Sequence, residues 1–346
     1  MDAEDDKTIS RKDMSNWQDL TLEERMVILQ QVAKTEKIPQ SAIEKDWWVT
    51  AVLKAIFQTE AAPKMLFKGG TSLSKGWHLI ERLSEDVDLA IDHTFFGING
   101  TTKSQRDKLR KTSRKYIQET LSKSLENNLK TMGCHGFSIE NVTEKPSGEP
   151  LDSDVDPTVI LMNYDSICEE AMDYIQPRVK IEISCLSMAE PCEEKEIESL
   201  IHKSYPDIDD ATVCHVRTVL PSRTFLEKAF LLNEEFQKEK PRSQRMSRHL
   251  YDLYMMMNTE FGKAALSDST LYASIVAHRK AYYAVKYIDY QKHHPSAIDF
   301  RPPEAVREAW KADYTRMLES FIYGNAPSFE ELCQEMERLV ERFRKV

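Results

Sequence analysis

Apolar residues at helical spacing dominate both ends of the chain. They recur every three or four positions over residues 20–34 and 43–57, which predicts two helices ahead of any sheet. From Pro221 onward nearly every segment has the same period, and Ser328 is a suitable N-cap for a last helix over Phe329–Phe343. The sequence therefore predicts helical regions at both ends, on either side of a different middle.

The middle of the chain contains short apolar and β-branched runs, which are typical of strands. These runs are Met65–Phe67, Asp86–Ile91, Thr158–Met162, Val179–Cys185 and Thr212–Val219. Between the first two, Gly69 and Gly70 predict a tight turn, and residues 73–83 have the spacing of a helix. We expect a small mixed sheet over about residues 64–220.

The segments between the strands differ in character. Residues 102–129 predict one long helix with a basic first half, because apolar side chains form a stripe along it. Residues 145–157 predict an exposed loop, and residues 191–203 predict an acidic connector or insertion. The expected fold is α+β, with one domain over residues 1–220 that includes the N-terminal helices and a helical domain over residues 221–346.

Composition narrows the possible functions. The 346 residues are 41% hydrophobic, which suits a globular protein, and 47 Lys and Arg against 57 Asp and Glu give a formal charge of −10. A broadly basic nucleic-acid coat is excluded, so any polyanion must be met by a local patch. Six cysteines without a Cys-x-x-Cys pair indicate neither a zinc site nor a disulfide framework. The acidic start, residues 1–7, and the absence of about 18 consecutive apolar residues predict a cytoplasmic protein without a membrane span.

The glycine pair is the first candidate for a binding site. Gly69 and Gly70 allow positive φ and close approach of a ligand to the backbone, and the N–H groups of Thr71 and Ser72 would begin a helix and point toward an anion. A phosphate would fit such a turn. It is not a Walker A loop, because no Gly-Lys-Ser/Thr follows Gly70 at the required spacing. Without other signals the pair would be an ordinary strand-to-helix turn.

A second candidate follows in the next strand. Asp86 and Asp88 are two residues apart, so they point to one face of a strand while Val87 and Leu89 face the core. Two neighbouring carboxylates repel each other unless a cation lies between them, and Mg²⁺ bridges carboxylate and triphosphate oxygens. A lone Asp-x-Asp is often a solvated strand edge, but the glycine turn just upstream favours a Mg²⁺ site at Asp86 and Asp88.

Six motifs occur in an order that resembles a known family. They are Ile43–Val49, Phe67–Lys75, Arg82–Leu89, Arg223–Lys228, Arg248–Leu253 and Asp313–Met317. The glycine turn, helix and Asp-x-Asp strand resemble the nucleotidyltransferase superfamily with a polymerase-β-like core. The whole run, over about residues 40–340, more closely resembles the AbiEii toxin family of bacterial abortive-infection toxin–antitoxin systems.

The resemblance implies a polymerase-β-like core and a Mg²⁺-dependent transfer of NMP from an NTP to an RNA acceptor. The expected acceptor is the 3′ end of a tRNA, whose modification would stop translation, and the expected partner is a cognate antitoxin. Carried over by position, nucleotide-binding residues would be Gly69, Gly70, Thr71, Ser72, Lys75 and Ser84. Asp86 and Asp88 would ligate the metal, and Lys228 and Asp252 would form a later catalytic pair. His249 stands where the family often has Asp, and Glu235 stands where it often has Arg.

Three of these assignments have competing interpretations. Lys228 could neutralise the triphosphate or be an ordinary helix lysine. Asp252, in an apolar helix, could be an exposed acid or need a partner such as Lys228. Glu182 alternates correctly along its predicted strand to face the Asp pair and activate the attacking hydroxyl, but it could equally be a surface acid paired with Lys180.

The acceptor is the least determined feature. A basic run on the long helix is the candidate RNA surface, or else a solvated helix face: Lys103, Arg106, Lys108, Arg110, Lys111, Arg114 and Lys115. Transfer to a protein hydroxyl, as in AMPylation, and transfer to a small molecule remain alternatives. So does a non-catalytic NTP-binding module.

Overall fold

The N-terminal part of the protein is helical, as the sequence predicts. The computed structural model describes residues 16–346 except 101, 154, 169–174 and 189–190, so the acidic start lies outside the described residues. Helix α1 spans Leu22–Glu36 and α2 spans Gln40–Ile56. Trp47 and Trp48 of α2 are 0% and 1% exposed, and they anchor this helix in the core against the sheet.

A mixed sheet of seven strands follows, in the order β3-β4-β5-β2-β1-β7-β6. Its strands are β1 Met65–Lys68, β2 Asp86–Ile91, β3 Phe137–Asn141, β4 Thr158–Tyr164, β5 Arg178–Ser184, β6 Cys192–Ile197 and β7 Cys214–Val219. Central strand β2 is antiparallel to β1 and parallel to β5. Its Val87 and Leu89 are fully buried in the core that also contains α2, which leaves Asp86 and Asp88 on the opposite face. The predicted mixed α/β fold is confirmed.

The two outermost strands were not predicted. The expected acidic connector over residues 191–203 is wrong: it contains β6 and the short helix α6 Leu200–Ser204. Both β6 and β3 lie at sheet edges, and their side chains are exposed or half-buried except for buried Ile197. Charged side chains protect an edge strand from pairing with another chain, and they also remove the apolar signal of a strand.

The predicted helix over residues 73–83 is also wrong beyond Gly76. The helical part consists of the short helix α3, Gly69–Thr71, and a π-helical turn over Ser72–Gly76. Residues 77–85 are irregular. Leu73 and Ile80, which produced the helical spacing, are buried in the second core among the C-terminal helices. This irregular segment runs across to those helices, where the N–H of Leu83 donates to the carbonyl of Phe321.

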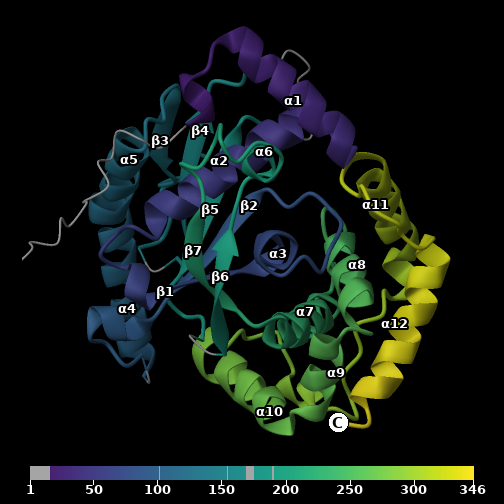
Figure 1. Cartoon of the computed structure of the whole chain (residues 1–346). Coiled ribbons are helices and arrows are strands. Elements are labelled where there is room, and N and C mark those ends of the chain that lie inside the picture. The colour runs from purple at the N-terminus through teal and green to yellow at the C-terminus, as the bar shows by residue number, and fades with distance from the viewer. Residues whose placement is uncertain (1–15, 101, 154, 169–174, 189–190) are drawn as a thin grey trace, which may run out of the picture.

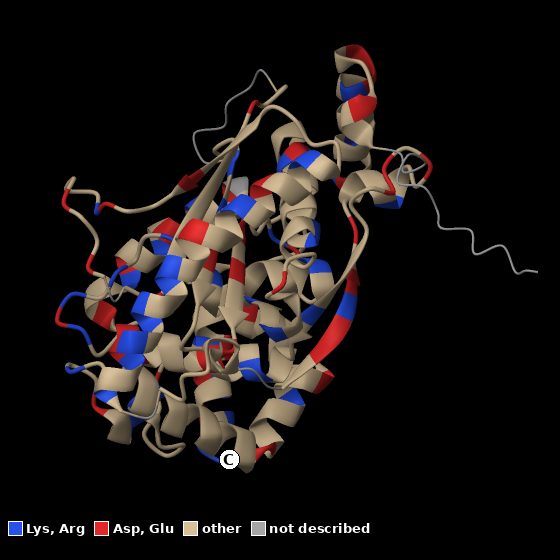
Figure 2. Ribbon diagram, turned by 90° about the vertical axis from the view of Figure 1, so that its left-hand side faces the viewer, with Lys and Arg blue, Asp and Glu red and all other residues tan. Residues whose placement is uncertain are grey.

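The long helix after β2 forms as predicted, with one irregular turn. Helix α4 spans Lys103–Tyr116, a π-helical turn spans Ile117–Leu121 and α5 spans Ser122–Thr131. The predicted apolar stripe is buried against the sheet side of the core. Lys103, Lys108, Lys111 and Lys115 of α4 are exposed on its outer side, whereas Arg106, Arg110 and Arg114 are half-buried. Lys and Arg are blue in the ribbon of Figure 2, in which the left-hand side of Figure 1, where α4 lies, faces the viewer.

Six helices complete the chain and pack around a second core. They are α7 Pro221–Glu235, α8 Ser247–Met256, α9 Glu260–Ser267, α10 Ser269–His278, α11 Arg307–Ser320 and α12 Phe329–Phe343. Ser328 caps α12 in a capping box with Glu331, which confirms the predicted start of this helix. In Figure 1 these helices curve around the lower and right-hand sides of the sheet.

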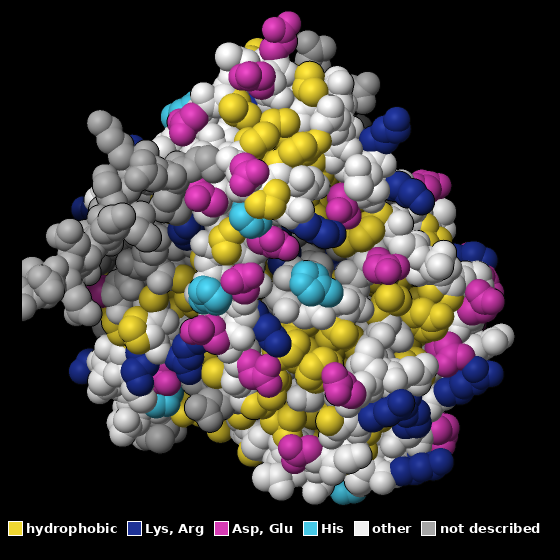
Figure 3. All heavy atoms as spheres, viewed as in Figure 1, with side chains coloured by type: hydrophobic (Ala, Val, Ile, Leu, Met, Phe, Trp, Pro, Cys, Tyr) yellow, Lys and Arg dark blue, Asp and Glu magenta, His cyan; other side chains and the backbone are white. Residues whose placement is uncertain are grey.

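Two surface findings bear on partners. None of the helices in the described part of the chain is long and apolar enough to span a bilayer. The face shown in Figure 3 carries acidic and basic side chains interspersed, without a large field of one sign. Contact of this face with a polyanion must therefore use a local concentration of cations.

Candidate active site

A large cavity lies between the polar face of the sheet and helices α7 and α8. Its volume is about 860 Å³, which is within the range of about 300–1,000 Å³ usual for ligand sites. It is lined by both predicted metal ligands, by the glycine turn and by Lys228. Segments that are far apart in the sequence thus meet at one place.

Asp86, Asp88 and Glu182 line the same cavity because of the register of the central strands. Asp88 on β2 lies opposite Glu182 on β5 and opposite Lys68 on β1. Asp86 is two residues from Asp88 and lines the same cavity. Glu182 also pairs with Lys180, so both expected features of this residue occur together: it faces the site and it has a lysine partner.

The carboxylates are held in surroundings that disfavour their negative charge. Burial, together with the charges of Glu182 and Asp86, raises the pKa of Asp88 to about 6, although Lys68 and Arg248 offset part of the effect. Burial and the neighbouring Glu85 also raise the pKa of Asp86. A divalent cation at this position would relieve the repulsion and lower both pKa values.

The glycine turn lies directly against Asp88. Gly69 has φ +78°, and a Cβ there would be 2.0 Å from Oδ2 of Asp88. A Cβ on Gly70 would be 2.7 Å from Nη2 of Arg82 and 2.8 Å from Oγ of Ser84. Glycine is required at residue 69 both for its backbone conformation and for space, and the turn, Ser84 and Asp88 form one wall of the cavity.

Three other predicted nucleotide-binding residues have side chains that point elsewhere. Thr71 donates a hydrogen bond to the carbonyl of Asp86, and Ser72 donates one to the carbonyl of Gly69. Lys75 pairs with Asp46 of α2, because the π-helical turn directs it to that helix. None of the three lines the cavity. Their binding of nucleotide stays a prediction, which the positions of their side chains do not support; these side chains instead support the turn.

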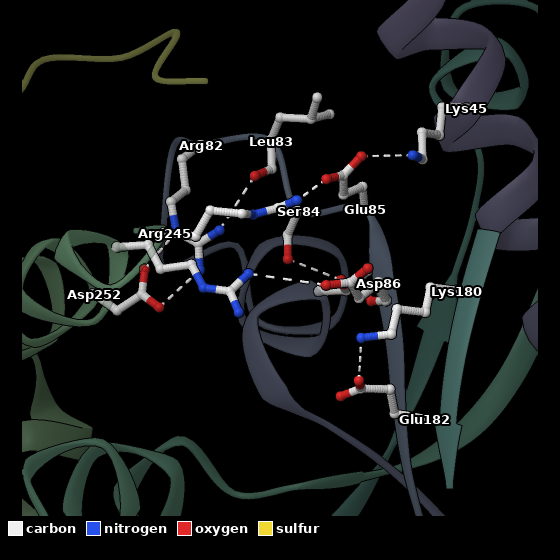
Figure 4. Close-up of polar contacts among 12 residues, drawn as sticks. Lys45, Arg82, Leu83, Ser84, Glu85, Asp86, Lys180, Glu182, Arg245 and Asp252 are labelled. Carbon is white, nitrogen blue, oxygen red and sulfur yellow. Dashed lines mark hydrogen bonds and ion pairs between the residues drawn. The ribbon is translucent and has the colours of Figure 1, made fainter. Parts of the chain in front are cut away.

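Asp252 on α8 holds two cations at the edge of the cavity. It accepts hydrogen bonds from Nε and Nη2 of Arg82 and pairs with Lys228 at 2.8 Å, as Figure 4 shows for Arg82. The expectation that buried Asp252 has Lys228 as a partner is confirmed. Burial alone would raise the pKa of Asp252, but the two cations outweigh it and hold the pKa well below its usual range. Burial lowers the pKa of Lys228.

Sequence reasoning missed Arg82 and Arg248 as site residues. Arg82 is 3% exposed and lines the cavity beside Gly70. Arg248 lines it from α8, with Nη1 3.9 Å from Oδ2 of Asp86. The sequence did contain a signal for both residues, because each is the first residue of a motif that resembles the family. Arg82 begins the motif Arg82–Leu89, and Arg248 begins the motif Arg248–Leu253.

The two departures from the family pattern have different positions. His249 lines the cavity, and burial, with the nearby charges of Lys228 and Arg248, lowers its pKa well below the ordinary value, so the ring is neutral at physiological pH. Glu235 lies outside the lining; it is 3% exposed and binds Arg242, which does line the cavity. Glu235 therefore supports the wall instead of contacting a ligand in the cavity.

The basic run of α4 divides into separate groups. Arg110 lines the main cavity and pairs with Asp107 at 3.0 Å. Lys103, Lys108 and Lys111 line a shallow depression elsewhere. The run is thus continuous with the candidate active site only through Arg110.

The donor set fits Mg²⁺ only when substrate oxygens complete it. No group of three or more His, Cys, Asp or Glu side chains in the described ranges is arranged to hold a metal ion. Asp86 and Asp88 supply two hard oxygen ligands, and Mg²⁺ usually combines one or two carboxylates with phosphate oxygens and water. The site thus suits a cation that arrives with a triphosphate.

Comparison with known proteins defines the class. Residues 51–335 match the family model described as "Nucleotidyl transferase AbiEii toxin, Type IV TA system". The protein is a nucleotidyltransferase. It belongs to the AbiEii toxin family of type IV toxin–antitoxin systems, which implies an NTP as donor and an antitoxin as partner.

This chain was also compared with solved structures and with curated proteins. The fold is similar to that of MenT4, a nucleotidyltransferase toxin from Mycobacterium tuberculosis H37Rv, with a TM-score of 0.43 and 15% identity over 94% of this chain and 99% of that chain. No curated protein matches the sequence.

Proposed function

We propose that this toxin transfers a nucleoside monophosphate from an NTP to an RNA acceptor in a Mg²⁺-dependent reaction, that the acceptor is the 3′ end of a tRNA, and that the modification blocks translation. In the transfer, the acceptor oxygen forms a bond to the α-phosphorus. The bond from that phosphorus to its bridging oxygen breaks, and pyrophosphate leaves with the electron pair. The acceptor proton passes to a base of the enzyme.

One observation carries this proposal: Asp86, Asp88 and the Gly69–Gly70 turn form one wall of a nucleotide-sized cavity. The absence of side chains at the turn leaves its backbone accessible to phosphate oxygens beside the carboxylates. Mg²⁺ held by Asp86 and Asp88 would neutralise charge on the triphosphate and on the leaving pyrophosphate.

Protein cations supply the rest of the charge neutralisation. Lys68, Arg82, Lys228 and Arg248 all line the cavity. Phosphoryl-type transfer depends mainly on positioning and on stabilising negative charge, so cations held by buried partners suit this chemistry. The ion pairs of Asp252 with Arg82 and Lys228 fix the two side chains before substrate binds.

Glu182 is the candidate base. It lies opposite Asp88 in the sheet and lines the cavity, so its carboxylate is within the same group as the metal ligands. A carboxylate in this position would accept the proton of the attacking hydroxyl. Lys180, two residues earlier on the same strand, is its ion-pair partner.

Labelling with α-labelled NTPs tests the proposal. Purified protein is incubated with each NTP, Mg²⁺ and total bacterial RNA, and the products are separated by size. We expect labelled RNA of tRNA size, released pyrophosphate, and a loss of at least about 100-fold with Asp88→Asn, because a ligand that stabilises transition-state charge is removed. Glu330→Gln is the matched control, since this exposed carboxylate pairs with Lys311 far from the cavity.

Other products would identify other acceptors. Label on protein would indicate AMPylation-type transfer, and label on a small product would indicate modification of a metabolite or drug. If the wild-type protein binds NTP but, like Asp88→Asn, yields no labelled product, the proposal is contradicted.

A further inference from the structure

A second cavity opens beside the candidate active site, at Asp86. Its volume is about 300 Å³, and it shares Asp86 but no other lining residue with the larger cavity. Most of its lining is charged, from Lys45, Glu85, Asp86, Arg178, Lys180 and Arg245. Asp86 thus separates two cavities of different composition.

The register of β2 and β5 determines where the second cavity lies. The parallel strands place Asp88 opposite Glu182, and Asp86 opposite Lys180 one step nearer the beginning of both strands. Arg178 is the first residue of β5 and shares a face with residues 180 and 182. On this face the paired carboxylates Asp88 and Glu182 are therefore followed by Lys180 opposite Asp86 and then by Arg178, at the end of the site away from Lys68.

The second cavity has an excess of positive charge. Glu85 is already neutralised by Lys45 and Arg245, each at 2.5 Å, as Figure 4 shows. Those two ion pairs also connect α2 and the segment before α8 to the beginning of β2. Arg178 is exposed and has no ion-pair partner among the described residues. The cations thus exceed the carboxylates, which favours an anionic ligand.

We infer that this cavity binds phosphates of the acceptor polynucleotide and places its terminal hydroxyl at Asp86; the inference rests on the proposed nucleotidyl transfer. The attacking and leaving oxygens must be roughly in line on opposite sides of the phosphorus. The triphosphate at the Gly69–Gly70 turn occupies one side of Asp86, so the acceptor approaches from the other. A chain of phosphates matches the cations of the second cavity, whereas a protein or neutral small-molecule hydroxyl does not.

This placement differs from the one suggested by the basic run of α4. Lys103, Lys108 and Lys111 line a depression that contains none of the residues around Asp86. RNA bound only in the α4 depression would not contact the protein beside Asp86, where the attacking hydroxyl must lie. The two surfaces can be tested against each other.

Charge reversal at single exposed residues separates the two surfaces. Arg178→Glu tests the second cavity, Arg178→Lys tests rescue by charge, and Lys111→Glu tests α4. Lys123→Glu, on the exposed side of α5, is the control for a change in net charge. For each variant, binding of an unmodified tRNA is measured at several salt concentrations without NTP, and the KM values for RNA and for NTP are measured separately.

We expect Arg178→Glu to weaken RNA binding and raise the KM for RNA by about tenfold, and to reduce the slope of log K against log salt by about 0.7 for a lost single-strand contact. The KM for NTP should not change, and Arg178→Lys should resemble wild type. RNA binding unaffected by Arg178→Glu but lost with Lys111→Glu would overturn the inference. If the wild-type protein transfers no nucleotide at all, the proposed function is overturned. RNA binding measured without NTP would still show whether RNA is held in the second cavity or on α4.

Discussion

Asp252 accepts hydrogen bonds from Arg82 at 2.7 Å and 2.8 Å, and its carboxylate lies 2.8 Å from Lys228. The three side chains come from the segment after the glycine turn, from α8 and from α7, and all are nearly inaccessible to solvent. Removing one member of such a buried group leaves charges without partners, which costs far more than loss of an exposed pair. This group therefore links the stability of the fold to the geometry of the cavity.

The first prediction concerns this ion-pair group. Asp252→Asn should lower the free energy of unfolding by about 3–5 kcal/mol, because Arg82 and Lys228 remain buried without a counter-charge. Glu330→Gln, which breaks the exposed pair with Lys311, should have little effect on stability, because solvent screens this pair. Denaturant unfolding of both variants checks the difference, and equal small losses would show that the buried group contributes little.

A second prediction concerns the space at the glycine turn. Gly69→Ala should reduce transfer by about 100-fold, since the new methyl group must displace Asp88 by an ångström or more. Gly97→Ala is the matched control: Gly97 also has positive φ, but nothing lies within 4 Å of the position of a Cβ. Each variant should lose about 1–2 kcal/mol of stability from backbone strain. If the two variants also retain equal activity, contact with Asp88 is not important.

The third prediction separates the two interpretations of Glu182. If its carboxylate accepts the acceptor proton, Glu182→Gln should lower kcat by about 10²–10⁴-fold and leave the KM for NTP nearly unchanged. Lys180→Gln removes its ion-pair partner but keeps the carboxylate, so kcat should fall much less. Steady-state kinetics with saturating RNA measures both. A Glu182→Gln variant with wild-type kcat would leave Glu182 as a structural acid.

The fourth prediction concerns acid stability. Hydrogen bonds and ion pairs with Arg242 and Lys238 outweigh burial and lower the pKa of Glu235 to about 2, from an ordinary 4.5. Because the folded-state pKa is the lower one, this group stabilises the fold fully above about pH 4.5, and the contribution is lost as the pH falls toward 2. Glu235→Gln should thus reduce stability at neutral pH, and the difference from wild type should shrink over that window. Thermal unfolding across the pH range checks it, and a difference independent of pH would contradict the assignment.

Prediction from sequence succeeded where local pattern and burial agree. The buried α2, the central strands and the capped α12 have strong periodic signals, and the Asp86–Asp88 spacing determines that both carboxylates share a face. Prediction failed over residues 77–85 because their apolar residues pack against helices that are distant in the sequence. It also failed at β6, because exposed charged residues remove the apolar pattern of a strand. In these segments the tertiary surroundings outweigh local periodicity.

The sequence by itself predicted the mixed fold from its helical and strand-like patterns and indicated the family through the resemblance of six motifs. It also determined that Asp86 and Asp88 share a face, because that depends only on spacing along one strand. Only the tertiary structure decided that Arg82 joins Lys228 on Asp252, that Lys75 turns to Asp46, and that Asp86 separates two cavities. Those relationships join residues more than a hundred positions apart, or depend on the irregular turn after Gly70. Strand register and helix packing bring such groups together, and no local pattern in the sequence contains that information.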